Sequence, residues 1–252
     1  MPEPVLVAVA HGSADPRAAA TVADLMVTVA ERAAARGLRV PDLRSAYLGH
    51  AAPSLSQVMQ AVEGQVTVLP LLLTAAYHSK ADIPRVLARC GSHRVSYGAT
   101  LGPHPLLLRA LERRLTEAAC ADTARPQDAD PGRTGVVLAA AGSSDPEANA
   151  TIARLAAQWQ AKAGWFAVRP AYASAAAPSP AAAVTGLLQA GASRVLVATY
   201  LLAPGFFADR VRASCIAAGA AGVAAPLGAA TEVADVLLDR YQEAGSLRRT
   251  AA

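Results

Sequence analysis

The chain has 252 residues, of which 53% are hydrophobic and 17% charged, and its net charge is +4. This composition is typical of a globular protein and excludes a disordered chain, while the modest charge without a basic block makes nucleic acid an unsuitable partner. No apolar run approaches the roughly 20 residues of a membrane span, and the amino-terminal stretch lacks the basic region of a secretory leader. We therefore expect a cytoplasmic protein that contacts no membrane.

Strand-like and helix-like patterns alternate along the first half. Val22, Leu25 and Val29 recur at helical spacing, and Gly37 follows them as a helix stop. The predicted strands are Val5–Ala10, Arg39–Leu48, Gln65–Leu73 and Arg94–Tyr97. The predicted helices are Ala18–Arg36, Pro53–Val62, Asp82–Arg89 and Pro105–Ala119. This alternation predicts a parallel sheet flanked by helices, with ligands bound beyond the carboxyl ends of its strands.

The second half repeats the first. Four segments recur in the same order, as VLVAVAHGSADP and VVLAAAGSSDP, AYLGHAAPS and AYASAAAPS, QVTVLPLLL and RVLVATYLL, and LGPHPLLLRALERR and LGAATEVADVLLDR. The sequence therefore predicts an α/β protein of two chelatase-like lobes, each a parallel sheet flanked by helices, with a cleft between them. We expect an N-terminal catalytic lobe at residues 1–121, a linker at 122–134 and a degenerate repeat lobe at 135–252. Because the duplication can replace a dimer, we expect a monomer.

The two halves differ in their histidines. All five lie in the first half, at His11, His50, His78, His93 and His104. In the second half Ala141 replaces His11 and Phe207 replaces His78. Both of these histidines follow predicted strands, so we expect them to meet at one rim of the sheet. The simplest interpretation is that the first half is catalytic and the second completes the cleft.

Paired imidazoles suit the insertion of a metal into a macrocycle. Imidazole binds divalent iron, cobalt and nickel and also accepts protons near neutral pH. Both abilities are needed when a dication replaces two pyrrole protons. The residues predicted to contact the substrate are Gly12, Ser13, Tyr77, Ser79 and Lys80. Two alternatives stay open: the tyrosine either stacks on the ligand or packs in the core, and the lysine either binds an anion or is solvated.

Three motifs carry a family resemblance. AVAHGSADP, LPLLLTAAYHSKADIP and LGPHP resemble, in that order, the landmarks of the sirohydrochlorin chelatases, the class II chelatases. The resemblance implies a lyase that inserts ferrous iron or cobalt into sirohydrochlorin without ATP, in siroheme or cobalamin biosynthesis. It implies that His11 and His78 bind the ion and accept protons, and that the partner is a tetrapyrrole with carboxylate side chains. We expect no cofactor beyond the substrate ion, and nickel stays open.

The chain departs from the family in one segment. Family members usually have a glutamate in the part that matches AYLGHAAPS, where this chain has Gly49 and Ala52. Whether His50 or His104 assists in place of that acid stays open.

Two other functions stay open from the residues alone. A carrier of metal or tetrapyrrole would use the same pocket without turnover. A histidine phosphatase also begins with a strand and His-Gly, but it needs an arginine before the histidine, and Ala10 stands there.

Overall fold

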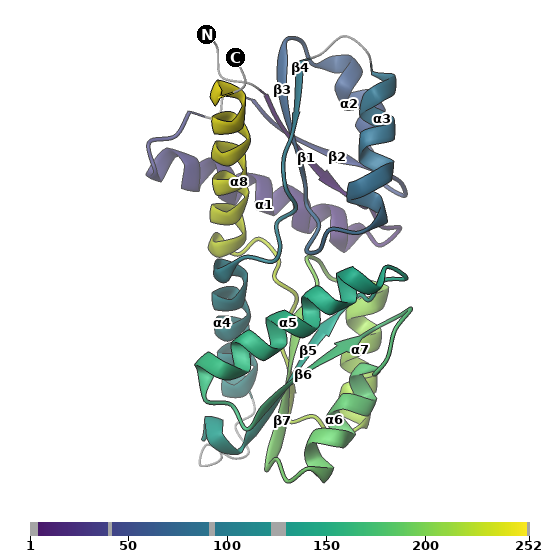
Figure 1. Cartoon of the computed structure of the whole chain (residues 1–252), viewed down its shortest axis with the longest axis vertical. Helices are drawn as coiled ribbons and strands as arrows, with labels where there is room; N and C mark the ends of the chain where they lie inside the picture. Colours follow the sequence, from purple (N-terminus) through teal and green to yellow (C-terminus); the bar gives the residue numbers. More distant parts are fainter. Residues whose placement is uncertain (1–4, 40–41, 91–93, 122–129, 251–252) are drawn as a thin grey trace. The chain divides into compact units, whose positions relative to one another are not determined.

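The computed structural model describes residues 5–39, 42–90, 94–121 and 130–250. Its first parallel sheet has the strand order β2-β1-β3-β4 (Figure 1). The strands are β1 (Val5–Ala10), β2 (Leu43–Tyr47), β3 (Gln65–Pro70) and β4 (Arg94–Tyr97). Because β1 lies between β2 and β3, the loops that leave these three strands emerge side by side at one edge of the sheet.

The first repeat has four helices, and short polar side chains cap two of them. They are α1 (Pro16–Ala35), α2 (Leu55–Ala61), α3 (Ile83–Arg89) and α4 (Pro105–Ala121). Asp15 caps α1 by accepting a hydrogen bond from the backbone N–H of Arg17, and Ser54 forms a capping box with Gln57 at α2. All four predicted helices are therefore present, with ends that differ by a few residues.

One short element was not predicted. A π-helix, His78–Asp82, precedes α3, and the third strand ends at Pro70 rather than at Leu73. The five residues of this turn have no apolar periodicity, so the sequence pattern does not distinguish the turn from a loop.

The second repeat builds the same sheet. Its strand order is β6-β5-β7-β8, with β5 (Thr134–Ala140), β6 (Ala167–Tyr172), β7 (Arg194–Tyr200) and β8 (Gly222–Val223). Its helices are α5 (Pro146–Ala163), α6 (Pro180–Gln189), α7 (Phe206–Ala217) and α8 (Thr231–Thr250). The predicted α/β architecture of two parallel sheets with flanking helices is confirmed.

Each sheet is buried by apolar side chains. Alternate residues of the central strand β1, Val7 and Val9, pack with α2 and α3. In the second repeat Val137 and Ala139 of β5 pack in the same way with α6 and α7. Central strands buried on both faces are typical of parallel sheets, which explains why they appear in the sequence as continuous apolar runs.

The compact units exchange their closing helices. One unit comprises residues 1–107 and 228–252, and the other comprises 108–227. The expected lobes at 1–121 and 135–252 each include the last helix of their own repeat. In the structure, by contrast, α8 belongs to the unit of the first sheet and nearly all of α4 to the unit of the second. A Cβ atom added at Gly98, just after β4, would lie 3.6 Å from Cβ of Ala244 in α8. One added at Gly222 in β8 would lie 3.5 Å from the carbonyl oxygen of Ala118 in α4.

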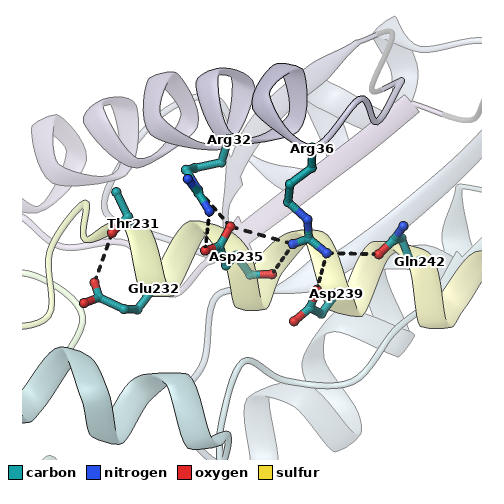
Figure 2. Close-up of polar contacts among 7 residues, drawn as sticks. All are labelled: Arg32, Arg36, Thr231, Glu232, Asp235, Asp239 and Gln242. Atoms are coloured by element: carbon teal, nitrogen blue, oxygen red, sulfur yellow. Dashed lines mark hydrogen bonds and ion pairs between the residues drawn. The ribbon is translucent and has the colours of Figure 1, made fainter.

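Ion pairs hold α8 against α1 in the first unit (Figure 2). Arg32 donates two hydrogen bonds of 2.9 Å to the carboxylate of Asp235, and Arg36 contacts Asp239 at 2.6 Å. In the second unit, the indole of Trp159 donates to Glu112 of α4 at 2.9 Å. The amphipathic pattern of a helix predicts that it covers a sheet but does not say which sheet, and this explains the difference from the expected lobes.

Across the described residues, no helix is both long and apolar enough to cross a membrane. The cleft expected between the halves stays a prediction.

Candidate metal centre

Three histidines lie on the three adjacent loops at the carboxyl edge of the first sheet. His11 follows the central strand β1, His50 follows β2, and His78 begins the π-helix after β3. The ring centroids of His11 and His78 are 4.6 Å apart in an edge-on arrangement, and those of His11 and His50 are 6.4 Å apart in a stacked one. The structure therefore brings together the two predicted imidazoles, with a third beside them.

The glycine after His11 allows the first two loops to touch. Gly12 has a φ of 90°, and a Cβ atom there would lie 1.7 Å from the carbonyl oxygen of Gly49. The backbone N–H of Gly49 donates to the carbonyl of His11 at 3.1 Å. The sequence predicts that this glycine contacts the substrate, and in the structure it makes room for the neighbouring loop. Its contact with substrate stays a prediction.

The ring of His11 presents one nitrogen as an acceptor. Its Nδ1 lies 3.0 Å from the carbonyl oxygen of Gly12. Because a carbonyl oxygen only accepts hydrogen bonds, Nδ1 carries the proton in this contact and the neutral ring keeps a lone pair on Nε2. The side chain is exposed, so this lone pair is accessible to an ion from solution.

Asp82 gives the second ring the same tautomer. The Nδ1 atom of His78 lies 2.7 Å from Oδ2 of Asp82, four residues later across the π-helix. A carboxylate that accepts from one imidazole nitrogen orients the ring and leaves the other nitrogen as a metal ligand. A guanidinium nitrogen of Arg85 lies 3.6 Å from the other carboxylate oxygen of Asp82 and forms an ion pair with it. The sequence interpretation missed this role, although the four-residue spacing of the two side chains was a usable signal.

Two of the predicted substrate contacts already have structural partners. The hydroxyl of Ser13 accepts a hydrogen bond from the backbone N–H of Asp15 at 3.1 Å, in the turn that begins α1. The hydroxyl of Ser79 is buried and exchanges hydrogen bonds with the backbone of Ala76. Tyr97 donates from its hydroxyl to the carbonyl of Ser79 at 2.7 Å, and burial raises the pKa of that phenol to about 12. These contacts stabilise the loops that carry His11 and His78.

The other two predicted contacts are exposed. Tyr77 is 57% exposed, and its ring lies 6.0 Å from that of His78, so it does not pack in the core. Lys80 is also exposed, on the same short helix.

Of the described histidines, only His104 is not part of the ring cluster. His104 lies just before α4, where its Nδ1 accepts a hydrogen bond from the backbone N–H of Leu106 at 3.2 Å. Burial lowers its pKa, and the positive charge of Arg240 acts in the same direction. The fifth histidine, at position 93, lies outside the described residues.

The second repeat has the loops without the imidazoles. Ala141 occupies the place of His11, and Phe206 and Phe207 begin α7 with 71% and 40% of their surface exposed. Their ring centroids are 5.7 Å apart. This end of the second sheet therefore offers aromatic surface in place of metal-binding nitrogens.

Comparisons with known proteins agree with this arrangement. The family model described as CbiX matches residues 5–118 and 135–244. A sirohydrochlorin ferrochelatase of Priestia megaterium is 27% identical over 198 residues, which are 75% of this chain and 71% of that protein. A sirohydrochlorin cobaltochelatase of the same organism is 27% identical over 150 residues, 58% of this chain but only 47% of that protein. The solved structure of SirB from Bacillus subtilis with Fe3+ aligns at a TM-score of 0.76 and 23% identity, over 96% of each chain; this last likeness shows a shared fold.

Proposed function

Because the chain belongs to the CbiX family, whose model matches both of its repeats, we propose that it inserts a divalent metal ion into sirohydrochlorin without ATP. The similarity to a ferrochelatase and a cobaltochelatase supports ferrous iron and cobalt as the substrate ions. The resemblance inferred from the three sequence motifs is confirmed at the level of the family. The observation that carries the proposal is the pair of imidazoles at 4.6 Å, His11 and His78.

The separation of these two rings suits a shared ion. Metal–imidazole bonds are about 2.0–2.1 Å long, so two rings that bind one ion have centroids no more than roughly 6 Å apart. At 4.6 Å the rings of His11 and His78 meet this condition, and each has its Nδ1 engaged by a protein oxygen. The Nε2 lone pairs would bind the ion, while Asp82 keeps the ring of His78 in place.

The same two nitrogens can remove the protons of the macrocycle. As the ion forms bonds to the pyrrole nitrogens, its bonds to His11 and His78 break and each Nε2 regains its lone pair. Two pyrrole N–H groups then transfer one proton each to these nitrogens. One dication is exchanged for two protons, so charge and atoms balance, and the exposed ring of His11 can pass its proton to water.

The exposed side chains near the pair suit the substrate. In this proposal the ring of Tyr77 stacks against the macrocycle, and Lys80 attracts its carboxylates. Ser13 and Ser79 act through the loops they hold and through their backbone groups, and Gly12 keeps the first loop in place. The N-terminal repeat would thus carry the chemistry in a monomeric enzyme that needs no further cofactor.

The test is anaerobic incubation of the protein with sirohydrochlorin and ferrous iron, cobalt or nickel, without ATP, followed by visible absorption. We expect many equivalents of metallated product per protein with iron or cobalt, well above the uncatalysed rate. Product that stops at one equivalent would instead identify a carrier. A rate equal to that of the ion and macrocycle without protein would contradict the proposed insertion activity.

A further inference from the structure

We propose that His50 is a third ion-binding side chain of this centre, and that the resulting all-imidazole donor set favours cobalt and nickel over harder ions such as Mn2+. This inference rests on the proposed function, because it concerns the ion that the proposed reaction consumes. The sequence motifs imply two ligands, His11 and His78, and the present inference adds a third from the loop that follows β2.

The first support is the placement of the ring. His50 follows β2, the strand next to β1, and its ring stacks on that of His11 at 6.4 Å with 27° between the planes. The two loops are joined by the hydrogen bond from Gly49 to the carbonyl of His11 and by the close approach at Gly12. The imidazole is therefore held beside the pair by the backbone itself.

The second support is that no hydrogen bond within the described residues engages the nitrogens of the ring. His50 is exposed. Its backbone has a φ of 59°, an uncommon conformation for a residue other than glycine. Ala175 has a φ of 58° at the matching position of the second repeat, so the loop adopts this conformation without needing an imidazole.

The distance calls for a small movement of the ring. At 6.4 Å the centroids of His50 and His11 are just beyond the roughly 6 Å at which two imidazoles share an ion. In the part of the chain that the structure describes, no three metal-binding side chains are already arranged around one point. An exposed side chain changes rotamer within nanoseconds, so His50 can turn onto an ion that His11 and His78 already hold.

The third support is the chemistry of the donors. Segment 46–54, which carries His50, contains no Asp or Glu. The nearby carboxylate of Asp82 is engaged by His78 at 2.7 Å and by Arg85. An incoming ion therefore meets nitrogen donors, which suit iron, cobalt and nickel, whereas carboxylate oxygens suit Mn2+ and Mg2+.

The experiment measures the binding of Co2+ and Mn2+ to the full chain by calorimetric titration, without tetrapyrrole. We expect His50→Ala to weaken Co2+ binding at least about tenfold, the smallest loss usual even for outer partners of metal ligands. Alanine fits this backbone, as Ala175 shows. We expect His50→Glu to recover part of the Co2+ affinity and to lower the ratio of Co2+ to Mn2+ affinity, because it replaces nitrogen by a carboxylate.

His104→Gln is the matched control, because it removes an imidazole whose Nδ1 is already engaged by Leu106; its Co2+ affinity should equal that of the unmodified chain. Co2+ binding by His50→Ala as tight as that of the unmodified chain would overturn the inference. An unchanged ratio of Co2+ to Mn2+ affinity in His50→Glu would overturn the selectivity. The insertion assay is separate: if the unmodified chain metallates sirohydrochlorin while His50→Ala binds Co2+ normally, only the role of His50 fails.

Discussion

The loops that follow the central strand and its neighbour, β1 and β2 in the first repeat and β5 and β6 in the second, have nearly the same backbone in the two repeats. Gly12 and Gly142 have φ values of 90° and 83°, and a Cβ atom at either would lie within 2 Å of a carbonyl oxygen of the next loop. His50 and Ala175 share a left-handed backbone. What differs is the side chains, since Ala141 stands where the first repeat has His11.

This difference separates the requirements of the fold from those of the proposed chemistry. A feature present in both repeats, such as the glycine contact, is explained by the packing of loops. A feature present in the first repeat alone, such as the cluster of imidazoles, is not required by the fold, because the second repeat adopts the same fold without it. Variants placed at matching positions of the two repeats can therefore test this separation.

The largest effect is expected at the paired rings. His11→Ala and His78→Ala should each lower the rate of metal insertion at least about 100-fold, because each removes a ligand and a proton acceptor together. Both should fold normally, since His11 is exposed and His78 half-buried. The initial rate of sirohydrochlorin metallation and the thermal unfolding midpoint check this. A variant with full activity would remove that residue from the mechanism.

A smaller loss is expected at the residue that orients His78. Asp82→Asn keeps the size of the side chain but removes the carboxylate at 2.7 Å, so the ring loses its fixed tautomer. We expect a loss of about 10–100-fold in Co2+ affinity. Calorimetric titration measures it, and Asp145→Asn, a capping carboxylate of the second repeat, serves as the control with unchanged affinity. Equal affinities in the two variants would show that Asp82 is dispensable.

The glycine pair tests the shared backbone directly. Gly12→Ala and Gly142→Ala each place a Cβ atom within 2 Å of a backbone carbonyl oxygen at a positive φ. The positive φ alone costs about 1–3 kcal/mol, and the displacement of the facing loop adds to this cost. We expect similar losses in the free energy of unfolding, measured with urea. Insertion activity should fall more for Gly12→Ala, because only that loop carries imidazoles. An equal loss of activity in both variants would contradict the proposal that only the loop of the first repeat takes part in the chemistry.

The smallest effect concerns His104, for which the second repeat has an alanine. Burial lowers the pKa of His104, with Arg240 acting in the same direction and Asp239 and Glu243 against it. The unfolded chain therefore binds this proton more tightly, and the contribution to stability is complete above the usual pKa of about 6.5 and is lost as the pH falls below it. Urea midpoints at low and neutral pH should differ less in His104→Gln. The same pH dependence in both proteins would contradict this.

Much of the fold could be predicted from local patterns. The strands Val5–Ala10 and Arg94–Tyr97 have the predicted ends, and the ends of α1 and α2 differ from the predicted ones by at most two residues. The π-helix at His78 was missed, because its residues carry no periodic apolar signal. With it the role of Asp82 was missed, since a contact across one turn depends on the turn being helical.

The sequence by itself determined the duplication, the alternation of strands and helices, and the restriction of histidines to one half, because composition and burial patterns are properties of the chain read locally. Only the tertiary structure decided that His11 is flanked by His50 and His78, since the strand order β2-β1-β3 arises from pairing across the whole sheet. It also decided that α8 closes the first unit and α4 the second. An apolar helix face can pack on either sheet, so that choice depends on the contacts of the folded chain as a whole.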